Sequence, residues 1–136
     1  MSTQNPLASS LNYRTRVERA RAGIPVAEAV EIMDTWSIPV ARFAAILGTS
    51  ERKWGRLRSA GNGAMLNTVE SDRLLRLRDV FEHALTVFDS DDDAVAWFSL
   101  PNQALSGDTP LSLMDTDAGV HEVDAVLTRL EFGVFA

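Results

Sequence analysis

The sequence predicts an all-α protein, and three observations support this fold class. Apolar residues recur at intervals of three and four along most of the chain, which is the spacing of one face of an α-helix. Residues that begin or end helices, mainly serine, threonine, glycine and proline, separate these periodic segments. No segment of useful length alternates apolar and polar residues as a half-buried β-strand does.

The composition is that of a globular protein and excludes several classes of function. The chain has 136 residues, of which 46% are apolar and 24% charged, enough for one compact domain or two very small ones. Without cysteine it has no disulfide, thiolate metal site or cysteine nucleophile. It shows no signal-peptide pattern and no apolar run near the roughly 20 residues of a membrane span. We expect a cytoplasmic protein that is not an enzyme and uses no cofactor or metal.

The net charge of −6 conceals an opposite sign in the two halves of the chain. Residues 1–78 hold 12 of the 13 lysines and arginines and 7 acidic residues, a net charge of +5. Residues 79–136 hold one arginine and 12 acidic residues, a net charge of −11. A basic half suits nucleic acid and an acidic half does not, so the halves are expected to have different partners.

The N-terminal segment is expected to be a flexible arm over residues 1–22. Residues 1–12 are polar and lack helical periodicity. The basic stretch that follows is either part of this arm or the start of a solvated helix. Its cations are Arg14, Arg16, Arg19 and Arg21.

Residues 23–67 have the pattern of three short helices. The first is expected after Gly23-Ile24-Pro25, with Val26, Val30 and Met33 at helical spacing. Ser37 is expected to cap the second helix, which ends at Gly48. The residues of this helix expected to point inward are Phe43, Ala44 and Leu47.

Residues 38–57 predict a helix-turn-helix. The second helix of the motif starts at Ser50, turns Trp54 and Leu57 inward and stops before Gly61-Asn62-Gly63. On its outer face, cations would be able to contact phosphates or guanine edges in the major groove. The candidate DNA-binding residues are Ser50, Arg52, Lys53 and Arg56. An ordinary helical hairpin with a solvated basic face has the same pattern and remains an alternative.

Residues 68–136 are expected to form a second helical domain. A long helix over about residues 68–88 and a last helix ending at Gly133 are joined by a short helix that begins at Asp91-Asp92-Asp93, where acidic residues favour a helix N-terminus. Thr109-Pro110 predicts a further helix start. The expected inner residues of the long helix are Leu74, Leu77, Phe81, Leu85 and Phe88. Those of the last helix are Val120, Val123, Leu127 and Leu130.

Candidate metal and catalytic residues are few. The acidic run starting at Asp89 has Ala94 and Leu100 where a calcium-binding EF-hand loop needs glycine and glutamate, so it is interpreted as a helix start. His83 and His121 have no partners at metal-ligand spacing and are interpreted as surface or half-buried histidines. The final segment, EFGVFA, is apolar to its last residue, which indicates that something packs on it.

Several residues of the second half keep a spacing that resembles the Xre/MbcA/ParS-type antitoxins. The resemblance covers about residues 22–136 and begins with Glu70-Ser71-Asp72-Arg73. The most specific part comes next in the chain and reads Trp97-x-x-x-Pro101-Asn102-x-x-Leu105-x-Gly107-x-Thr109-Pro110-Leu111. The resemblance ends with Gly119 and Gly133-Val134. The chain departs from the family at Ser106, where a second glycine is more common.

The resemblance implies a helix-turn-helix followed by a helical toxin-binding domain. It implies a partner toxin of the RES-domain type, which consumes NAD⁺ or uses it for ADP-ribosylation and is blocked by covering of its NAD site. It also implies a homodimer that binds operator DNA and represses its own operon. The implied toxin-binding residues are Trp97, Pro101, Asn102, Leu105, Gly107, Pro110, Leu111, Arg129, Gly133, Val134 and Phe135. A regulator whose second half only dimerises or binds a small ligand is the alternative.

Overall fold

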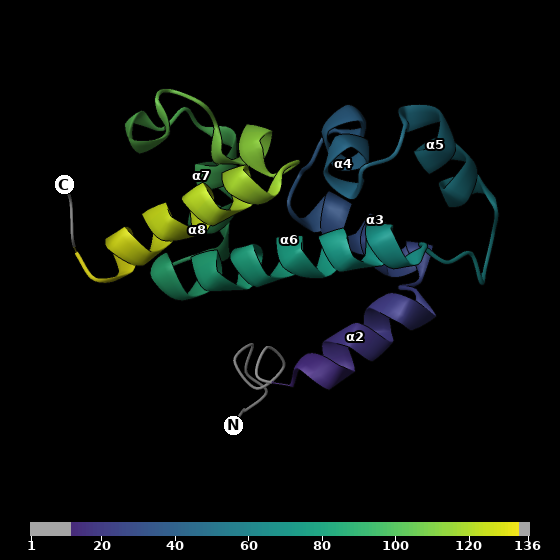
Figure 1. Ribbon diagram of the computed structural model, residues 1–136. Helices are drawn as coiled ribbons and strands as arrows, with labels where there is room; N and C mark the ends of the chain where they lie inside the picture. Colours follow the sequence, from purple (N-terminus) through teal and green to yellow (C-terminus); the bar gives the residue numbers. More distant parts are fainter. Residues whose placement is uncertain (1–11, 134–136) are drawn as a thin grey trace. The chain divides into compact units, whose positions relative to one another are not determined.

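The computed structural model describes residues 12–133, and in them it confirms the all-α fold class (Figure 1). These residues form α-helices and two short 3₁₀ helices, and they contain one isolated β-bridge, between Pro25 and Met65, in place of a strand. The helices are α2 (Tyr13–Ala22), α3 (Val26–Thr35), α4 (Val40–Leu47), α5 (Glu51–Ser59), α6 (Thr68–Val87), α7 (Asp91–Ser99), η1 (Gln103–Leu105), η2 (Pro110–Leu113) and α8 (Asp117–Glu131).

The chain divides into two compact units, one ending at Arg76 and the other beginning at Leu77. The division lies inside α6, whereas the expected domain boundary lies at the start of this helix, between residues 67 and 68. Each unit contains its own buried apolar core. Among residues 12–133, no helix has both the length and the apolar character that a membrane span requires.

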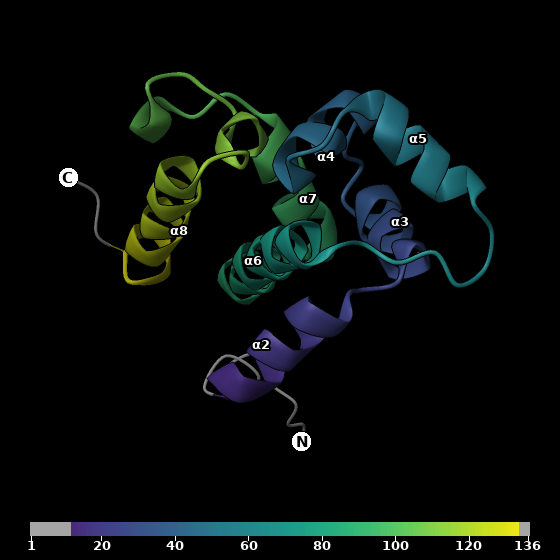
Figure 2. The same ribbon diagram turned by 45° about the vertical axis from the view of Figure 1, so that its right-hand side comes forward.

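In the first unit, α3, α4 and α5 lie together around a core that contains Trp54 (Figure 2). The Phe43 and Trp54 rings, with centroids 5.0 Å apart, join α4 to α5. Ala44 is buried, which agrees with a close approach of the two helices. Leu57 is only half-buried, although it was expected to point inward.

Residues 13–22 of the expected arm form helix α2. The Asn12 side chain caps it by accepting a hydrogen bond from the Thr15 N–H. Ala20 is its one buried residue, and Nη2 of Arg19 donates to both carboxylate oxygens of Glu28 of α3, at 3.0 and 2.9 Å. The alternative of a solvated basic helix therefore describes this stretch, and residues 1–11 lie outside the described residues.

Ser37 ends α3 and does not cap α4, so this part of the sequence prediction was wrong. Ser37 has a left-handed backbone (φ +54°), and the following Ile38 N–H donates to the Met33 carbonyl oxygen at 2.9 Å. This is the pattern that closes a helix C-terminus. Pro39 instead occupies the N-terminal cap position of α4, where its fixed φ and missing N–H are tolerated.

In the second unit, α7, η1, η2 and α8 pack with the second half of α6 around an aromatic cluster. Phe98 is its buried centre and contacts the rings of Phe81 and Trp97 edge-on, at centroid distances of 4.9 and 5.0 Å. The expected apolar stripe of α6 holds at Phe81, but Leu85 is 39% exposed and Ala84 takes the buried position beside it. The reason is that the buried face of α6 follows a step of three from Phe81, so that Leu85 lies beyond its edge.

The start of α8 lies directly against η2. A Cβ atom added to Gly119 would collide with the Leu113 carbonyl oxygen, so only glycine allows this approach. The Thr116 side chain caps α8, and the Thr109 side chain caps η2 with Pro110 at its first position, as predicted. Val120, Val123 and Leu127 of α8 are buried as expected, but Leu130 is only half-buried.

Candidate functional site

The predicted helix-turn-helix is formed by α4 and α5. Gly48 ends α4 in the left-handed conformation (φ +78°), and Ser50 begins α5 by accepting a hydrogen bond from the Lys53 N–H at 3.0 Å. Arg52 and Arg56 are exposed and four residues apart, so they lie on the same face of α5. This face can present two guanidinium groups to an anionic surface.

Lys53 differs from its neighbours because its ammonium group is held within the unit. Its Nζ lies 2.9 Å from Oε2 of Glu70, a carboxylate that is almost fully buried. The other oxygen of Glu70 accepts a hydrogen bond from the Asn67 N–H, and the Asn67 side chain accepts one from the Glu70 N–H. This reciprocal pair caps the start of α6. Lys53 therefore ties α5 to the N-terminus of α6.

The motif Glu70-Ser71-Asp72-Arg73 joins several segments of the first unit to α6. Besides the Glu70 contacts, the buried Ser71 hydroxyl accepts a hydrogen bond from the Ile24 N–H at 2.9 Å and donates one to the Leu66 carbonyl oxygen at 3.5 Å. The Arg73 guanidinium lies against Gly48, at the C-terminal end of α4, where a cation is favoured by the helix dipole. Three of the four residues that carry the family resemblance here, Glu70, Ser71 and Arg73, are thus explained by folding, whereas Asp72 is exposed.

In the second unit, the residues that the resemblance assigns to toxin binding separate by burial. Leu105, Pro110 and Leu111 are buried and build the core around η1 and η2. Trp97 and Arg129 are half-buried, while Pro101, Gly107 and Gly133 are exposed. Val134 and Phe135 lie outside the described residues.

Asn102 organises the loop between α7 and η2. Its side-chain oxygen accepts a hydrogen bond from the Ala104 N–H, its N–H donates to the Asp108 carbonyl oxygen, and its carbonyl oxygen accepts from the Gly107 N–H. Ser106 has a left-handed backbone (φ +59°), the conformation that glycine adopts most readily. The chain therefore keeps the backbone of a glycine loop at the position where it departs from the family.

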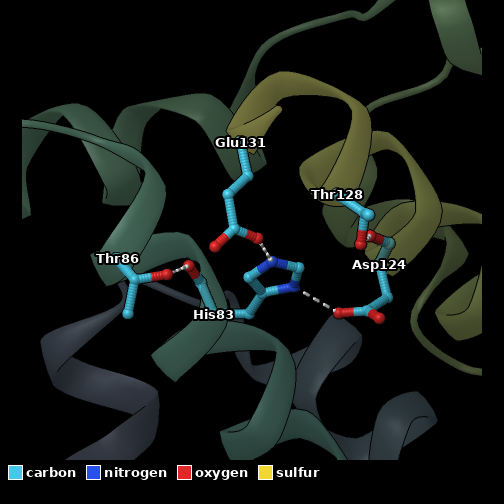
Figure 3. Close-up of polar contacts among 5 residues, drawn as sticks. All are labelled: His83, Thr86, Asp124, Thr128 and Glu131. Carbon is cyan, nitrogen blue, oxygen red and sulfur yellow. Dashed lines mark hydrogen bonds and ion pairs between the residues drawn. The ribbon is translucent and has the colours of Figure 1, made fainter. Parts of the chain in front are cut away.

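His83 of α6 bridges two carboxylates of α8 within the second unit (Figure 3). Its Nδ1 lies 2.7 Å from Asp124 Oδ1, and its Nε2 lies 2.9 Å from Glu131 Oε1. Burial of the ring lowers the pKa of His83, but hydrogen bonds and the negative charges of Asp124 and Glu131 outweigh it and raise that pKa above the ordinary 6.5. We call these three residues the His83 clamp.

The His83 clamp was missed at the sequence level, although one signal was present. Asp124 and Glu131 are seven residues apart and so share one face of α8. The clamp is not suited to one metal ion, because the two carboxylates contact opposite nitrogens of the same ring. In the part of the chain that the structure describes, no group of histidine and acidic side chains has the arrangement of a metal site.

Comparison with known proteins assigns both units. Residues 15–79 match the model of the antitoxin Xre-like helix-turn-helix domain, and residues 83–133 match that of the antitoxin Xre/MbcA/ParS C-terminal toxin-binding domain. A protein named antitoxin Xre from Yersinia enterocolitica is 31% identical over 122 residues, which cover 88% of this chain and 80% of the relative. The chain belongs to the Xre antitoxin family.

Two further relatives carry the same name. Antitoxin Xre of Photorhabdus laumondii is 31% identical over 82% of this chain and 75% of its own length. Antitoxin Xre of Pseudomonas putida is 34% identical over 50% of this chain and 43% of its own length. The antitoxin thus has a helix-turn-helix in its first unit, binds a toxin through its second unit and is not an enzyme. A regulator whose second half only dimerises does not fit the toxin-binding match.

Proposed function

We propose that the antitoxin neutralises a RES-domain toxin, one that consumes NAD⁺ or uses it for ADP-ribosylation, by covering the toxin's NAD site. The observation that carries this proposal is the toxin-binding match over residues 83–133, in a segment that resembles antitoxins of RES-domain toxins. DNA and NAD⁺ are both available in the cytoplasm, where we propose that the antitoxin acts.

The charge of the second half supports this mode of inhibition. Residues 79–136 carry a net charge of −11, and a pocket that binds a phosphate-bearing ligand such as NAD⁺ is commonly basic. Complementary charge implies that the dissociation constant of the complex rises with salt concentration. A dissociation constant that does not change with salt would leave apolar burial as the main source of affinity.

The segment that follows α8 is the proposed occluding element. It is apolar, and Phe132 at its start is 71% exposed. A variant that lacks residues 132–136 keeps Glu131 and the whole of α8. We expect this deletion to restore NAD⁺ loss while the complex still forms. Inhibition that survives the deletion would place occlusion elsewhere on the second unit.

For the first unit, we propose that a homodimer binds operator DNA and represses the antitoxin's own operon. The supporting observations are the helix-turn-helix match and the exposed pair Arg52 and Arg56 beside the Ser50 cap. In this proposal Lys53 acts indirectly, by orienting α5 through its ion pair with Glu70.

Operator binding is tested with Arg52→Ala and Arg56→Ala. Each lost phosphate contact is expected to lower the slope of affinity against salt by about 1, and a lost base contact to cost about 1–3 kcal/mol. Toxin neutralisation is expected to stay at the level of the unmodified chain. DNA affinity that is unaffected by both changes would remove α5 as the contact helix.

The decisive experiment is to measure intracellular NAD⁺ after induction of the protein encoded beside this chain, with and without the antitoxin. We expect NAD⁺ to collapse without the antitoxin and to be preserved on co-expression. Constant NAD⁺ with rescued growth would instead indicate a toxin that modifies a protein. If neither NAD⁺ nor growth responds, the proposed partner is wrong.

A further inference from the structure

We propose that His83 is a positioning residue for toxin inhibition, because it ties the C-terminal part of α8 to α6 through Asp124 and Glu131. The inference rests on the proposed function, in which the segment after α8 covers the toxin's NAD site. Through the His83 clamp, the direction in which the chain leaves α8 would depend on the protonation of one side chain.

In the clamp, the imidazole ring of His83 contacts two residues of α8 that lie two helical turns apart. Asp124 and Glu131 lie on the same face of the helix, and each contacts a different nitrogen of His83 at 2.7 and 2.9 Å. Two threonines beside the clamp bond to the backbone of their own helices and leave its side chains to one another. The Thr86 hydroxyl donates to the His83 carbonyl oxygen, and the Thr128 hydroxyl donates to the Asp124 carbonyl oxygen (Figure 3).

The clamp contacts α8 where apolar packing ends. Val123, Val126 and Leu127 are buried, but every side chain from residue 128 to 133 is half-buried or exposed. Glu131 is the last residue of α8, and its carboxylate contacts His83. His83 therefore supplies a polar attachment for the last turn, next to the exposed Phe132.

The two hydrogen bonds require a protonated ring. Ionised carboxylates only accept hydrogen bonds, so both nitrogens of His83 must donate, which only the imidazolium form can do. Asp124 and Glu131 are the charged groups of α8 that act on the ring. On α6, Asp79 lies one turn before His83, and Glu82 is adjacent to it and paired with Arg78 at 3.8 Å.

Deprotonation leaves one ring nitrogen without a hydrogen atom. That nitrogen then faces a carboxylate oxygen lone pair, so one of the two attachments is lost. Because the pKa of His83 is raised in the folded chain, this release occurs as the pH rises through a value above 6.5.

The protonation state is testable on the full-length antitoxin alone, by ¹⁵N NMR of its histidine side chains. We expect both nitrogens of His83 to carry protons at pH 6.5 and the ring to titrate above that value. His121, which is exposed on α8, serves to assign the second set of signals by its His121→Gln variant. A neutral His83 ring at pH 6.5 would overturn the clamp.

The positioning role is tested by inhibition of the purified toxin encoded beside this chain, with NAD⁺ loss as the readout. We expect inhibition by the unmodified antitoxin to weaken as the pH rises, and His83→Gln to weaken it at pH 6.5 on the order of tenfold. His83→Arg keeps a cation with several donors, so we expect it to preserve inhibition without the pH dependence. His121→Gln is the matched control and should behave as the unmodified chain.

The deletion of residues 132–136 separates failure of this inference from failure of the proposed function. If the deletion relieves inhibition but His83→Gln inhibits normally at every pH, His83 has no positioning role and occlusion by the tail stands. If the deletion inhibits normally, occlusion by the tail is wrong and the inference falls with it. If His83→Gln is unfolded by circular dichroism, the pH profile of His83→Arg decides, and a profile identical to that of the unmodified chain overturns the proposal.

Discussion

In each unit of the antitoxin, one ionisable side chain of α6 contacts another helix, and these two anchors differ in burial. Glu70 in the first unit has a side chain that is 4% exposed, and it contacts Lys53 and caps its own helix. His83 in the second unit is 20% exposed, and its partners Asp124 and Glu131 are 48% and 39% exposed. Glu70 itself is shielded from water, although the side chain of its partner Lys53 is 40% exposed, whereas all three residues of the His83 clamp are partly exposed.

This difference in burial distinguishes a helix contact through a buried carboxylate in the first unit from a helix contact through partly exposed side chains in the second. Removal of a buried carboxylate costs its hydrogen bonds as well as its ion pair, whereas a partly exposed pair is screened by water and contributes less. In the proposed function α5 contacts DNA and needs a constant orientation, which the ion pair between Lys53 of α5 and the buried Glu70 of α6 supplies. The proposed role of His83 of α6, which contacts α8 through Asp124 and Glu131, instead makes the second unit sensitive to pH.

The largest expected effect comes from removal of the buried anchor. Glu70→Ala eliminates half of the α6 cap and the ion pair to Lys53, whose side chain is 40% exposed, and we expect it to destabilise the first unit by about 2–4 kcal/mol. Urea unfolding followed by tryptophan fluorescence measures this loss, because two of the three tryptophans, Trp36 and Trp54, lie in the first unit. An effect below about 1 kcal/mol would show that Glu70 is no more an anchor than His83 is.

A steric test comes next, in the second unit. Gly119→Ala would place a methyl group against the Leu113 carbonyl oxygen, and we expect destabilisation of about 1–3 kcal/mol from overpacking. Hydrogen exchange at α8 and η2 locates the effect. Unchanged protection there would mean that α8 can move away from η2 at little cost.

A glycine-to-alanine substitution in α5 of the first unit is expected to stabilise the protein, whereas Gly119→Ala destabilises it. Gly55 lies within α5 with open space around the position of a Cβ atom, so Gly55→Ala gains helix propensity without a collision. We expect stabilisation by about 0.5–1 kcal/mol, seen as a higher midpoint in thermal unfolding. Destabilisation would reveal a contact that α5 makes through this face, such as with a second copy of the chain.

The smallest expected effect is the pH dependence of the second unit. Because the pKa of His83 is raised above 6.5 on folding, the clamp contributes its full stability below about pH 6.5 and loses it as the pH rises through the raised value. The difference in thermal midpoint between the unmodified chain and His83→Gln should therefore shrink with rising pH. A difference that stays constant from pH 6 to 9 would mean that the clamp does not titrate.

Much of the fold was predictable because local signals and packing agree along this chain. Gly48 ends α4, Ser50 caps α5, and Thr109-Pro110 begins η2, each through a backbone geometry that its own residue type favours. Ser37 misled the prediction because serine caps helices in general, while here the neighbouring Pro39 sets the start of α4. Leu85 misled it because periodicity defines a stripe without defining its edges.

The sequence alone determined the fold class, the opposite charges of the two halves and the residues of the family resemblance. These properties depend on residue identity and on separations of a few positions, so they are visible without a structure. Only the tertiary structure decided that Lys53 belongs to Glu70, that Leu105, Pro110 and Leu111 are buried, and that His83 meets Asp124 and Glu131. Such contacts join residues of separate helices, up to 48 positions apart for His83 and Glu131, and their geometry exists only once those helices have packed.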